Sequence, residues 1–284
     1  MIKLLYFFPE NPALLNQGNN SRANFLLNYF NSKSYSVDLV GEYEQKFTEK
    51  DIDTLKQLKL VNNAWLLKKD VKNFTHFITD VLPDKLYKGI LKIISPYAYK
   101  KNYDLNKLKK GYLQTFETIL KSKQYDVVII SYTSWSPLIK NISNISPNTK
   151  IIIDTHDFIT AQYQSKPHFD IGYYFKKEIE SLKLFDEIWA ISIEEQFIFS
   201  QFIESNKVKL VPHGTKINTQ KKSNAFNIDL LYVASDNPHN IKSALWFLNE
   251  VLPLLPENLK ITFVGKICKQ VPDSPRIEKI NFVE

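Results

Sequence analysis

Residues 126–131 (DVVIIS) and 150–154 (KIIID) decide the fold, because each is a short unbroken run of mainly β-branched residues. Such runs are typical of strands buried on both faces of a parallel sheet. Similar runs recur on both sides and predict further strands at 2–8, 37–40, 187–191, 208–211, 228–234, 261–265 and 277–283. Because stretches with helical patterns separate these strands, the sequence predicts an α/β chain with parallel sheets.

The helices between these strands are predicted from apolar spacing and from capping residues. Ser192 and Glu195 form a capping-box pattern, and Asn237 followed by Pro238 is a typical helix start. Apolar residues with helical spacing predict helices over 21–30, from 171 to 185 and from 238 onward. The Lys-rich stretch 49–123 is expected to be mostly helical, with interruptions near Pro83 and Pro96.

The length of 284 residues suggests about two domains at roughly 150 residues each. We expect a first Rossmann-like domain over 1–211, a polar hinge or linker over 212–227, and a second domain over 228–284. The last range is short for a doubly wound domain, so the second domain is expected to be incomplete.

Composition excludes several classes of protein. The chain is 44% hydrophobic and 24% charged, which excludes global disorder. Cys268 is the only cysteine, so there is no disulfide framework, and a reducing cytoplasm is expected. No stretch reaches 18 apolar residues, and the N-terminus lacks a small-residue cleavage site, so the sequence predicts neither a membrane-spanning helix nor a signal peptide.

The net charge of +7 is concentrated in residues 84–123, which hold ten lysines and three acids. This segment is either a solvated helical face or a surface for phosphates, such as an anionic membrane or a lipid-linked substrate. Only two of the 37 basic residues are arginines, Arg22 and Arg276. This points to coding bias rather than to selection for bidentate binding of phosphate by arginine. No nucleic-acid-binding motif is present, so no nucleic-acid partner is expected.

Polar residues directly follow the predicted strand 150–154. Asp154, His156 and Asp157 stand at its carboxyl end, where open parallel sheets bind ligands. The alternatives are a capping aspartate and a loop histidine satisfied by its neighbours. These residue types could ligate a metal, but their spacing matches no specific metal site, so none is expected.

Two predicted helix starts are candidate phosphate sites, because a helix N-terminus favours an anion. The first carries Gly18 and Asn19 in a loop, with Arg22 adding charge, and the second carries Ser235, Asn240 and Lys242. Ordinary strand-to-helix loops are the alternative for both. His213 and Gly214 lie in the predicted hinge, where glycine permits an unusual backbone angle, although a simple turn explains them equally well.

Four segments in this order resemble a GT-B-fold glycosyltransferase of the retaining glycosyltransferase family 4 type. They are FFPENPALLNQGNNSRANFLL (7–27), KIIIDTHDFITAQYQ (150–164), EIESLKLFDEIWAISIEEQ (178–196), and VKLVPHGTKI (208–217) followed by LLYVASDNPHNIKSALWFLNEVLPLL (230–255). Together they span most of the chain, and they imply an acceptor-side Rossmann-like domain over 1–211 and a partial nucleotide-sugar-binding domain over 228–284.

The resemblance implies transfer of a sugar from a nucleotide-sugar donor to a glycan or lipid-linked acceptor in surface polysaccharide synthesis, without a cofactor or metal. It implies that His156 contacts the donor sugar, that Asp157 serves the reaction, and that Lys242 is the family's donor-site lysine. The family's arginine has no counterpart, so Ser235 or Asn240 would replace it. Two family glutamates would lie beyond residue 284.

Two other functions remain open at this point. A non-catalytic or split subunit would need a partner chain to complete the donor site. An epimerase of the same fold would change a nucleotide sugar with no acceptor present. The resemblance favours the transferase, located in the cytoplasm or on the inner face of the membrane.

Overall fold

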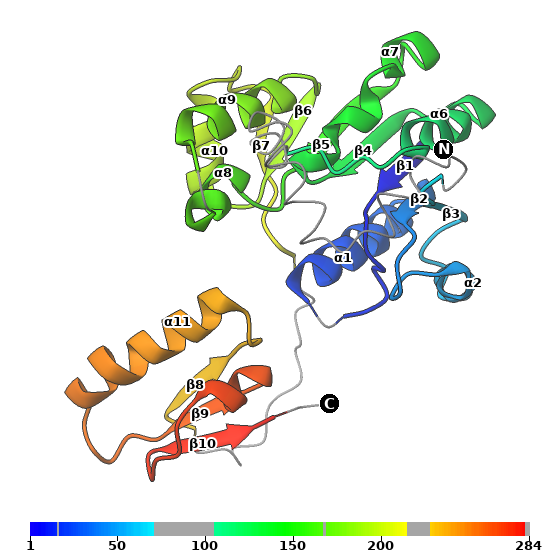
Figure 1. Cartoon of the computed structure of the whole chain (residues 1–284). Coiled ribbons are helices and arrows are strands. Elements are labelled where there is room, and N and C mark those ends of the chain that lie inside the picture. Colours follow the sequence, from blue (N-terminus) through cyan, green and yellow to red (C-terminus); the bar gives the residue numbers. More distant parts are fainter. Residues whose placement is uncertain (16, 71–104, 167–168, 215–227, 282–284) are drawn as a thin grey trace, which may run out of the picture. The chain divides into compact units, whose positions relative to one another are not determined.

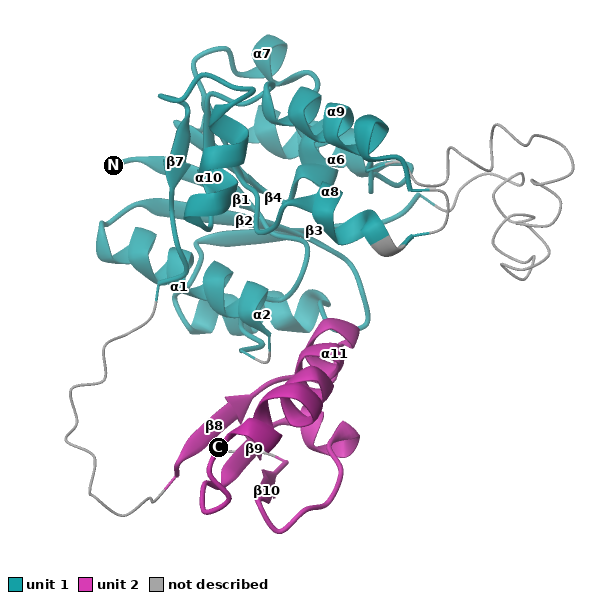
Figure 2. Cartoon of the chain, turned by 90° about the vertical axis from the view of Figure 1, so that its left-hand side faces the viewer, with its two compact units in different colours: residues 1–216 teal, residues 217–284 magenta. Residues whose placement is uncertain are grey.

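The computed structural model describes residues 1–15, 17–70, 105–166, 169–214 and 228–281. The chain divides into two compact units, residues 1–216 and residues 217–284 (Figure 2). We call these unit 1 and unit 2, and each is described by itself.

Unit 1 is built on a seven-stranded sheet in which all neighbouring strands are parallel (Figure 1). The strands are β1 (Lys3–Phe7), β2 (Ser36–Glu42), β3 (Asn63–Leu67), β4 (Val127–Ser131), β5 (Lys150–Asp154), β6 (Glu187–Ala190) and β7 (Val208–Leu210). Their order is β3-β2-β1-β4-β5-β6-β7, so the direction of winding reverses between β1 and β4. In doubly wound sheets, the carboxyl ends of the strands at such a switch point form the ligand crevice.

Helices and short turns connect the strands of unit 1. They are α1 (Gly18–Ser32), α2 (Glu49–Gln57), α6 (Tyr112–Ser122), the 3-10 helix η1 (Thr133–Ile139), α7 (Ile142–Ile145), α8 (Ile159–Gln162), η2 (Tyr163–Ser165), α9 (Ile171–Leu182) and α10 (Ile193–Ser200). The predicted cap of α10 is present, since the Ser192 hydroxyl accepts from the Glu195 backbone N–H. Asp170, which was not predicted as a cap, caps α9 by accepting from the Tyr173 N–H.

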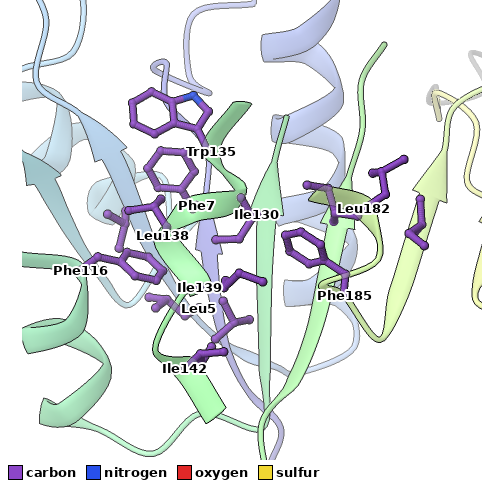
Figure 3. Packing of buried hydrophobic residues seen from close by; sticks show 14 of the residues in the cluster. Leu5, Phe7, Phe116, Ile130, Trp135, Leu138, Ile139, Ile142, Leu182 and Phe185 are labelled. Carbon is purple, nitrogen blue, oxygen red and sulfur yellow. The ribbon is translucent and has the colours of Figure 1, made fainter. Parts of the chain in front are cut away.

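Two apolar cores cover the two faces of this sheet. Leu5 and Phe7 of β1 point into one core with α6, η1 and α9 (Figure 3). Leu4 and Tyr6 point into the other core with α1. Burial on both faces is the physical reason for the continuous apolar runs in the strands.

Unit 2 is a three-stranded parallel sheet in the order β10-β9-β8. Its strands are β8 (Leu230–Val233), β9 (Ile261–Val264) and β10 (Ile277–Ile280), and its helix α11 (Pro238–Trp246) continues into one π-helical turn η3 (Phe247–Val251), followed by η4 (Leu252–Leu254) and η5 (Lys266–Gln270). As expected, Asn237 caps α11 by accepting from the Asn240 N–H, with Pro238 in the first turn. The two units together confirm the predicted α/β fold with parallel sheets.

Two predictions for the N-terminal half were wrong. Residues 63–67 of the supposedly helical stretch form strand β3, because pairing with β2 outweighs the local helical preference of the surrounding residues. Helix α1 starts at Gly18, three residues earlier than predicted, because Gln17 takes the extended cap conformation.

The basic segment 84–123 is described only from residue 105 onward, so most of this surface prediction lies outside the described residues. Within the described part, Lys109 pairs with Glu42 and Lys123 pairs with Asp38, at 2.6 and 2.7 Å. Both acids are buried, so these two lysines compensate internal charge instead of forming a free cationic face. Across the described ranges, no helix combines the length and the apolar character needed to cross a bilayer.

Candidate functional site

A buried ion pair joins helix α1 to the carboxyl end of β5. The Arg22 guanidinium donates from Nε to both carboxylate oxygens of Asp154 at 3.0 and 3.1 Å, and from Nη2 to Oδ1 at 2.7 Å. Arg22 is 4% exposed and Asp154 is fully buried. A buried two-pronged pair of this kind fixes the geometry of both groups, and it is costly to break.

His156 is held against the same carboxylate. Its Nε2 donates to Asp154 Oδ2 at 3.0 Å and lies 3.2 Å from Ser131 Oγ, which in turn donates to the Tyr6 hydroxyl at 3.0 Å. Nε2 therefore faces the interior, and Nδ1 has no hydrogen-bond partner among the described residues. Nδ1 is therefore the nitrogen left for a ligand, and it can accept a hydrogen bond when the imidazole is neutral and donate one when the imidazole is protonated.

The backbone is strained at the ends of two neighbouring strands. Tyr132 follows β4 with φ +66°, and His156 follows β5 with φ +61°, both in the left-handed region that favours glycine. The two rings stack with centroids 4.2 Å apart, and Phe8 stacks on the imidazole at 5.8 Å. Such conformations cost about 1–3 kcal/mol each and persist where surrounding contacts enforce them, often at functional sites.

Electrostatics separate the two aspartates next to His156. Burial alone would raise the pKa of Asp154, but the charge and hydrogen bond of His156, together with Arg22, outweigh it and hold that pKa below its ordinary value. The pKa of Asp157 is raised by burial, which the Gln162 hydrogen bond and the His156 charge only partly offset. Asp154 is thus a fixed negative charge, whereas Asp157 takes up a proton more readily than an ordinary aspartate.

The first candidate phosphate site differs from the expected loop. Gly18 lies inside α1, and a side chain there would meet no atom within 4 Å. The Asn19 amide donates to Glu10 Oε1 at 3.0 Å and to the Tyr132 hydroxyl at 2.9 Å. Arg22 donates its hydrogen bonds to Asp154, the carboxylate that also binds His156. Its charge is therefore paired and is not available to an anion at the helix start.

Gly214 is required for a different reason from the one predicted. Its φ is outside the left-handed region, but a Cβ on this residue would lie 2.2 Å from the Phe25 ring of α1. The chain after β7 therefore passes directly over α1, and glycine permits the close approach. His213, its neighbour, is exposed, and residues 215–227 of the predicted hinge lie outside the described residues.

The second candidate phosphate site lies in unit 2, at the start of α11. The Asn240 amide donates to the Ser235 carbonyl and hydroxyl oxygens, both at 3.1 Å, so these two residues stabilise the turn before the helix. Lys242 is exposed on the first turns of the helix. The structure brings the three residues into one helix start, and their role toward a phosphate stays a prediction.

The sequence analysis missed a cavity of about 650 Å³ at the carboxyl ends of β1 and β2. Glu42, the last residue of β2, lines it and carried a usable signal, because it follows the predicted strand 37–40 by two residues. Lys107 and Trp135 also line it, and they are brought there from distant parts of the sequence. Among the described residues, no cluster of three or more His, Cys, Asp or Glu side chains could hold a metal ion.

Comparisons with known proteins identify the fold. No family model and no curated protein sequence matches the chain. Among solved structures, it is similar to TarM of S. aureus in complex with fondaparinux, alpha-GlcNAc-glycerol and UDP (TM-score 0.58, 10% identity, 100% of this chain and 78% of that one).

Two further structures show the same likeness. One is the lipopolysaccharide outer core galactosyltransferase WaaB (TM-score 0.56, 12% identity, 99% of this chain and 68% of that one). The other is sucrose-phosphate synthase from Thermosynechococcus elongatus (TM-score 0.59, 10% identity, 100% and 71%). At these identities the likeness establishes the GT-B architecture of two Rossmann-like units, as predicted, and nothing finer.

Proposed function

We propose that this GT-B-fold chain transfers a sugar from a nucleoside-diphosphate donor to a hydroxyl group of a glycan or lipid-linked acceptor. The observation that carries the proposal is the fixed, strained His156 beside Asp157 at the carboxyl end of β5, in a fold whose solved relatives include a galactosyltransferase and a UDP complex. Ligands of open parallel sheets bind at this edge.

In this proposal His156 positions the donor sugar. Asp154 and Arg22 hold its Nε2 side, so Nδ1 is presented to a sugar hydroxyl without loss of ring freedom on binding. Asp157, whose pKa burial raises, is placed to exchange a hydrogen bond or proton with the incoming acceptor.

In unit 1, the helix start at Gly18 would stabilise the negative charge that develops on a leaving diphosphate. In unit 2, the start of α11 at Asn237, with Lys242 as its cation, is a candidate phosphate site by itself. Asn19 and Arg22 act indirectly, by holding Tyr132 and Asp154. The finer expectations also belong to this proposal: retention of configuration, independence of metal, a role in surface polysaccharide synthesis, and a cytoplasmic site at an anionic membrane surface.

The experiment measures release of the nucleoside diphosphate when the purified chain is incubated with UDP-, GDP- and ADP-sugars, with and without saccharide acceptors. We expect release with at least one donor, and a loss of about 10²-fold in kcat/KM for His156→Ala. Glu180→Gln, an exposed position on α9 away from these residues, is the control and should keep wild-type activity.

Three outcomes would count against the proposal. Absence of release with every donor would contradict it for this chain, and rescue by a second polypeptide would support the split-subunit alternative. A changed nucleotide sugar without acceptor would indicate epimerisation. Wild-type activity of His156→Ala would remove the role given to β5.

A further inference from the structure

The cavity at the carboxyl ends of β1 and β2 is separate from the His156 side chain but adjoins it. Pro9 and Glu10, which line the cavity, directly follow Phe8, and Phe8 stacks on His156. The Asn19 amide bridges Glu10 and the Tyr132 hydroxyl, and the Tyr132 ring stacks on the same imidazole. A ligand in the cavity therefore lies one layer of side chains away from the proposed reaction site.

The cavity contains one buried hydrogen-bond acceptor with a fixed orientation. Glu42 is 7% exposed, and its Oε1 accepts from Lys109 Nζ at 2.6 Å and from the Tyr112 hydroxyl at 2.9 Å. Its Oε2 accepts no hydrogen bond from the described part of the chain. This oxygen is thus held in place and available to a donor in the cavity.

The cavity wall also contains one buried donor without an acceptor. Trp135 is 1% exposed, and its indole Nε1 has no hydrogen-bond partner among the described residues. Its ring packs on Phe7 (Figure 3). It also stacks on Tyr112, the residue that donates to Glu42. In Figure 3 the nitrogen lies on the side of the ring away from Phe7. An unpaired buried N–H is costly, and in a side chain that lines a cavity an acceptor supplied by a ligand would remove that cost.

The charges around the cavity distinguish between classes of ligand. The charged lining residues are Glu10, Glu42, Glu44, Lys46 and Lys107. Lys109 already neutralises Glu42, which leaves two acids against two lysines. A phosphate group would need an excess of positive charge, whereas a hydroxyl group can donate to a carboxylate and accept from an N–H at the same time.

We propose that this cavity binds an uncharged saccharide through its hydroxyl groups, with Glu42 Oε2 accepting from a hydroxyl and Trp135 Nε1 donating to one. The inference rests on the proposed sugar transfer for its functional meaning, since the bound saccharide is then the acceptor. The inference specifies the acceptor further: the part of it that the cavity binds is a neutral sugar and not a lipid phosphate.

The test uses the indole N–H signals of the full chain, labelled with ¹⁵N. The chain has four tryptophans, so Trp135→Phe identifies the Trp135 signal by removing it while keeping an aromatic ring. The probes are neutral methyl glycosides of glucose, galactose, mannose and N-acetylglucosamine, with glycerol 3-phosphate and inorganic phosphate as anionic counterparts. We expect a glycoside to shift the Trp135 signal more than the other three.

Glu42→Gln should weaken glycoside binding about tenfold, because a charged acceptor is lost. Glu180→Gln is the matched control, because Glu180 is exposed on α9, pairs with Lys176 and Lys177, and does not line the cavity. If Glu42→Gln does not fold, saturation transfer from wild type and from Trp135→Phe to the glycoside tests the same site. The inference would be overturned if only the phosphates shifted the Trp135 signal, or if no probe shifted it. A glycoside-induced shift confined to another tryptophan would overturn it as well.

The two proposals can fail separately. Glycoside binding at Trp135 without release of nucleoside diphosphate from any donor would defeat the transfer proposal and keep the saccharide site. Sugar transfer with unchanged acceptor KM in both Trp135→Phe and Glu42→Gln would defeat the saccharide site and keep the transfer.

Discussion

The sheets of unit 1 and unit 2 are both parallel and start from similar sequences, yet they bury their residues differently. In β4 the segment VVIIS has its last four residues buried, whereas in β8 the segment LLYV alternates, with Leu231 57% and Val233 67% exposed. Helices cover both faces of the sheet in unit 1. In unit 2 the core residues of α11 and η5 lie with Leu230, Tyr232, Ile261 and Phe263, which share one face of the sheet.

The candidate site residues follow the same division. In unit 1, Arg22, Asp154 and His156 are buried and fix one another, so their geometry is set before a ligand binds. In unit 2, Ser235 and Lys242 are exposed on a helix start. This contrast teaches that similar apolar runs can support a preorganised site only where both faces of the sheet are covered.

The largest effect is expected from the buried ion pair of unit 1. Asp154→Asn leaves the Arg22 guanidinium buried without its counter-charge, and it should lower the free energy of unfolding by about 3–5 kcal/mol. Glu180→Gln, which breaks exposed pairs with Lys176 and Lys177, should cost less than about 1 kcal/mol. Urea unfolding followed by circular dichroism measures both, and equal costs would contradict the assigned role of burial.

The same pair predicts a pH dependence. The pKa of Asp154 is lower in the folded chain than its unfolded value of about 3.9. Its stabilisation is therefore fully present above about pH 4 and is lost as the pH falls through the lower folded value. The stability gap between wild type and Asp154→Asn should therefore narrow as the pH falls below about 4, which urea unfolding at several pH values measures.

A matched pair of substitutions tests the difference between the two sheets. Val128→Thr in β4 buries a hydroxyl in the core and should cost about 1–3 kcal/mol. Val233→Thr in β8 changes an exposed side chain and should stay within about 0.5 kcal/mol. Denaturant unfolding of both variants decides the matter, and a costly Val233→Thr would mean that this face of β8 is covered in solution.

Gly214→Ala tests the close approach of the chain to α1. The new Cβ would overlap the Phe25 ring, and the strain should cost about 1–3 kcal/mol. Phe25→Leu makes room, so the double variant should recover part of the loss, as measured by thermal unfolding in a double-mutant cycle. Additive losses would show that the two residues do not meet.

Gly18→Ala is expected to have a small effect on stability, of the opposite sign to the losses above. A methyl group there meets open space on a helix, so the unfolding free energy should rise by about 0.5 kcal/mol. If the backbone of Gly18 approaches the donor diphosphate as proposed, the donor KM should rise nonetheless. A stabilised variant with unchanged KM would remove Gly18 from the site.

Much of the candidate site could be located from the sequence, because strand ends are visible there. Asp154, His156 and Asp157 directly follow an unmistakable buried strand. Their partners were not predictable, since Arg22 lies 132 residues from Asp154 in the sequence and the ion pair depends on how α1 packs on the sheet. Glu42 and Trp135 were not predicted as site residues for the same reason, because the wall of a cavity is formed by residues that follow several different strands.

By itself, the sequence determined the elements of this protein and their class. Its apolar periodicity predicted nearly all strands, and its capping residues predicted the starts of α10 and α11, because both signals are local in the chain. Only the tertiary structure decided that residues 63–67 join the sheet, that Arg22 serves Asp154, and which sheet faces are covered. These outcomes depend on which distant residues compete for the same space and the same hydrogen bonds.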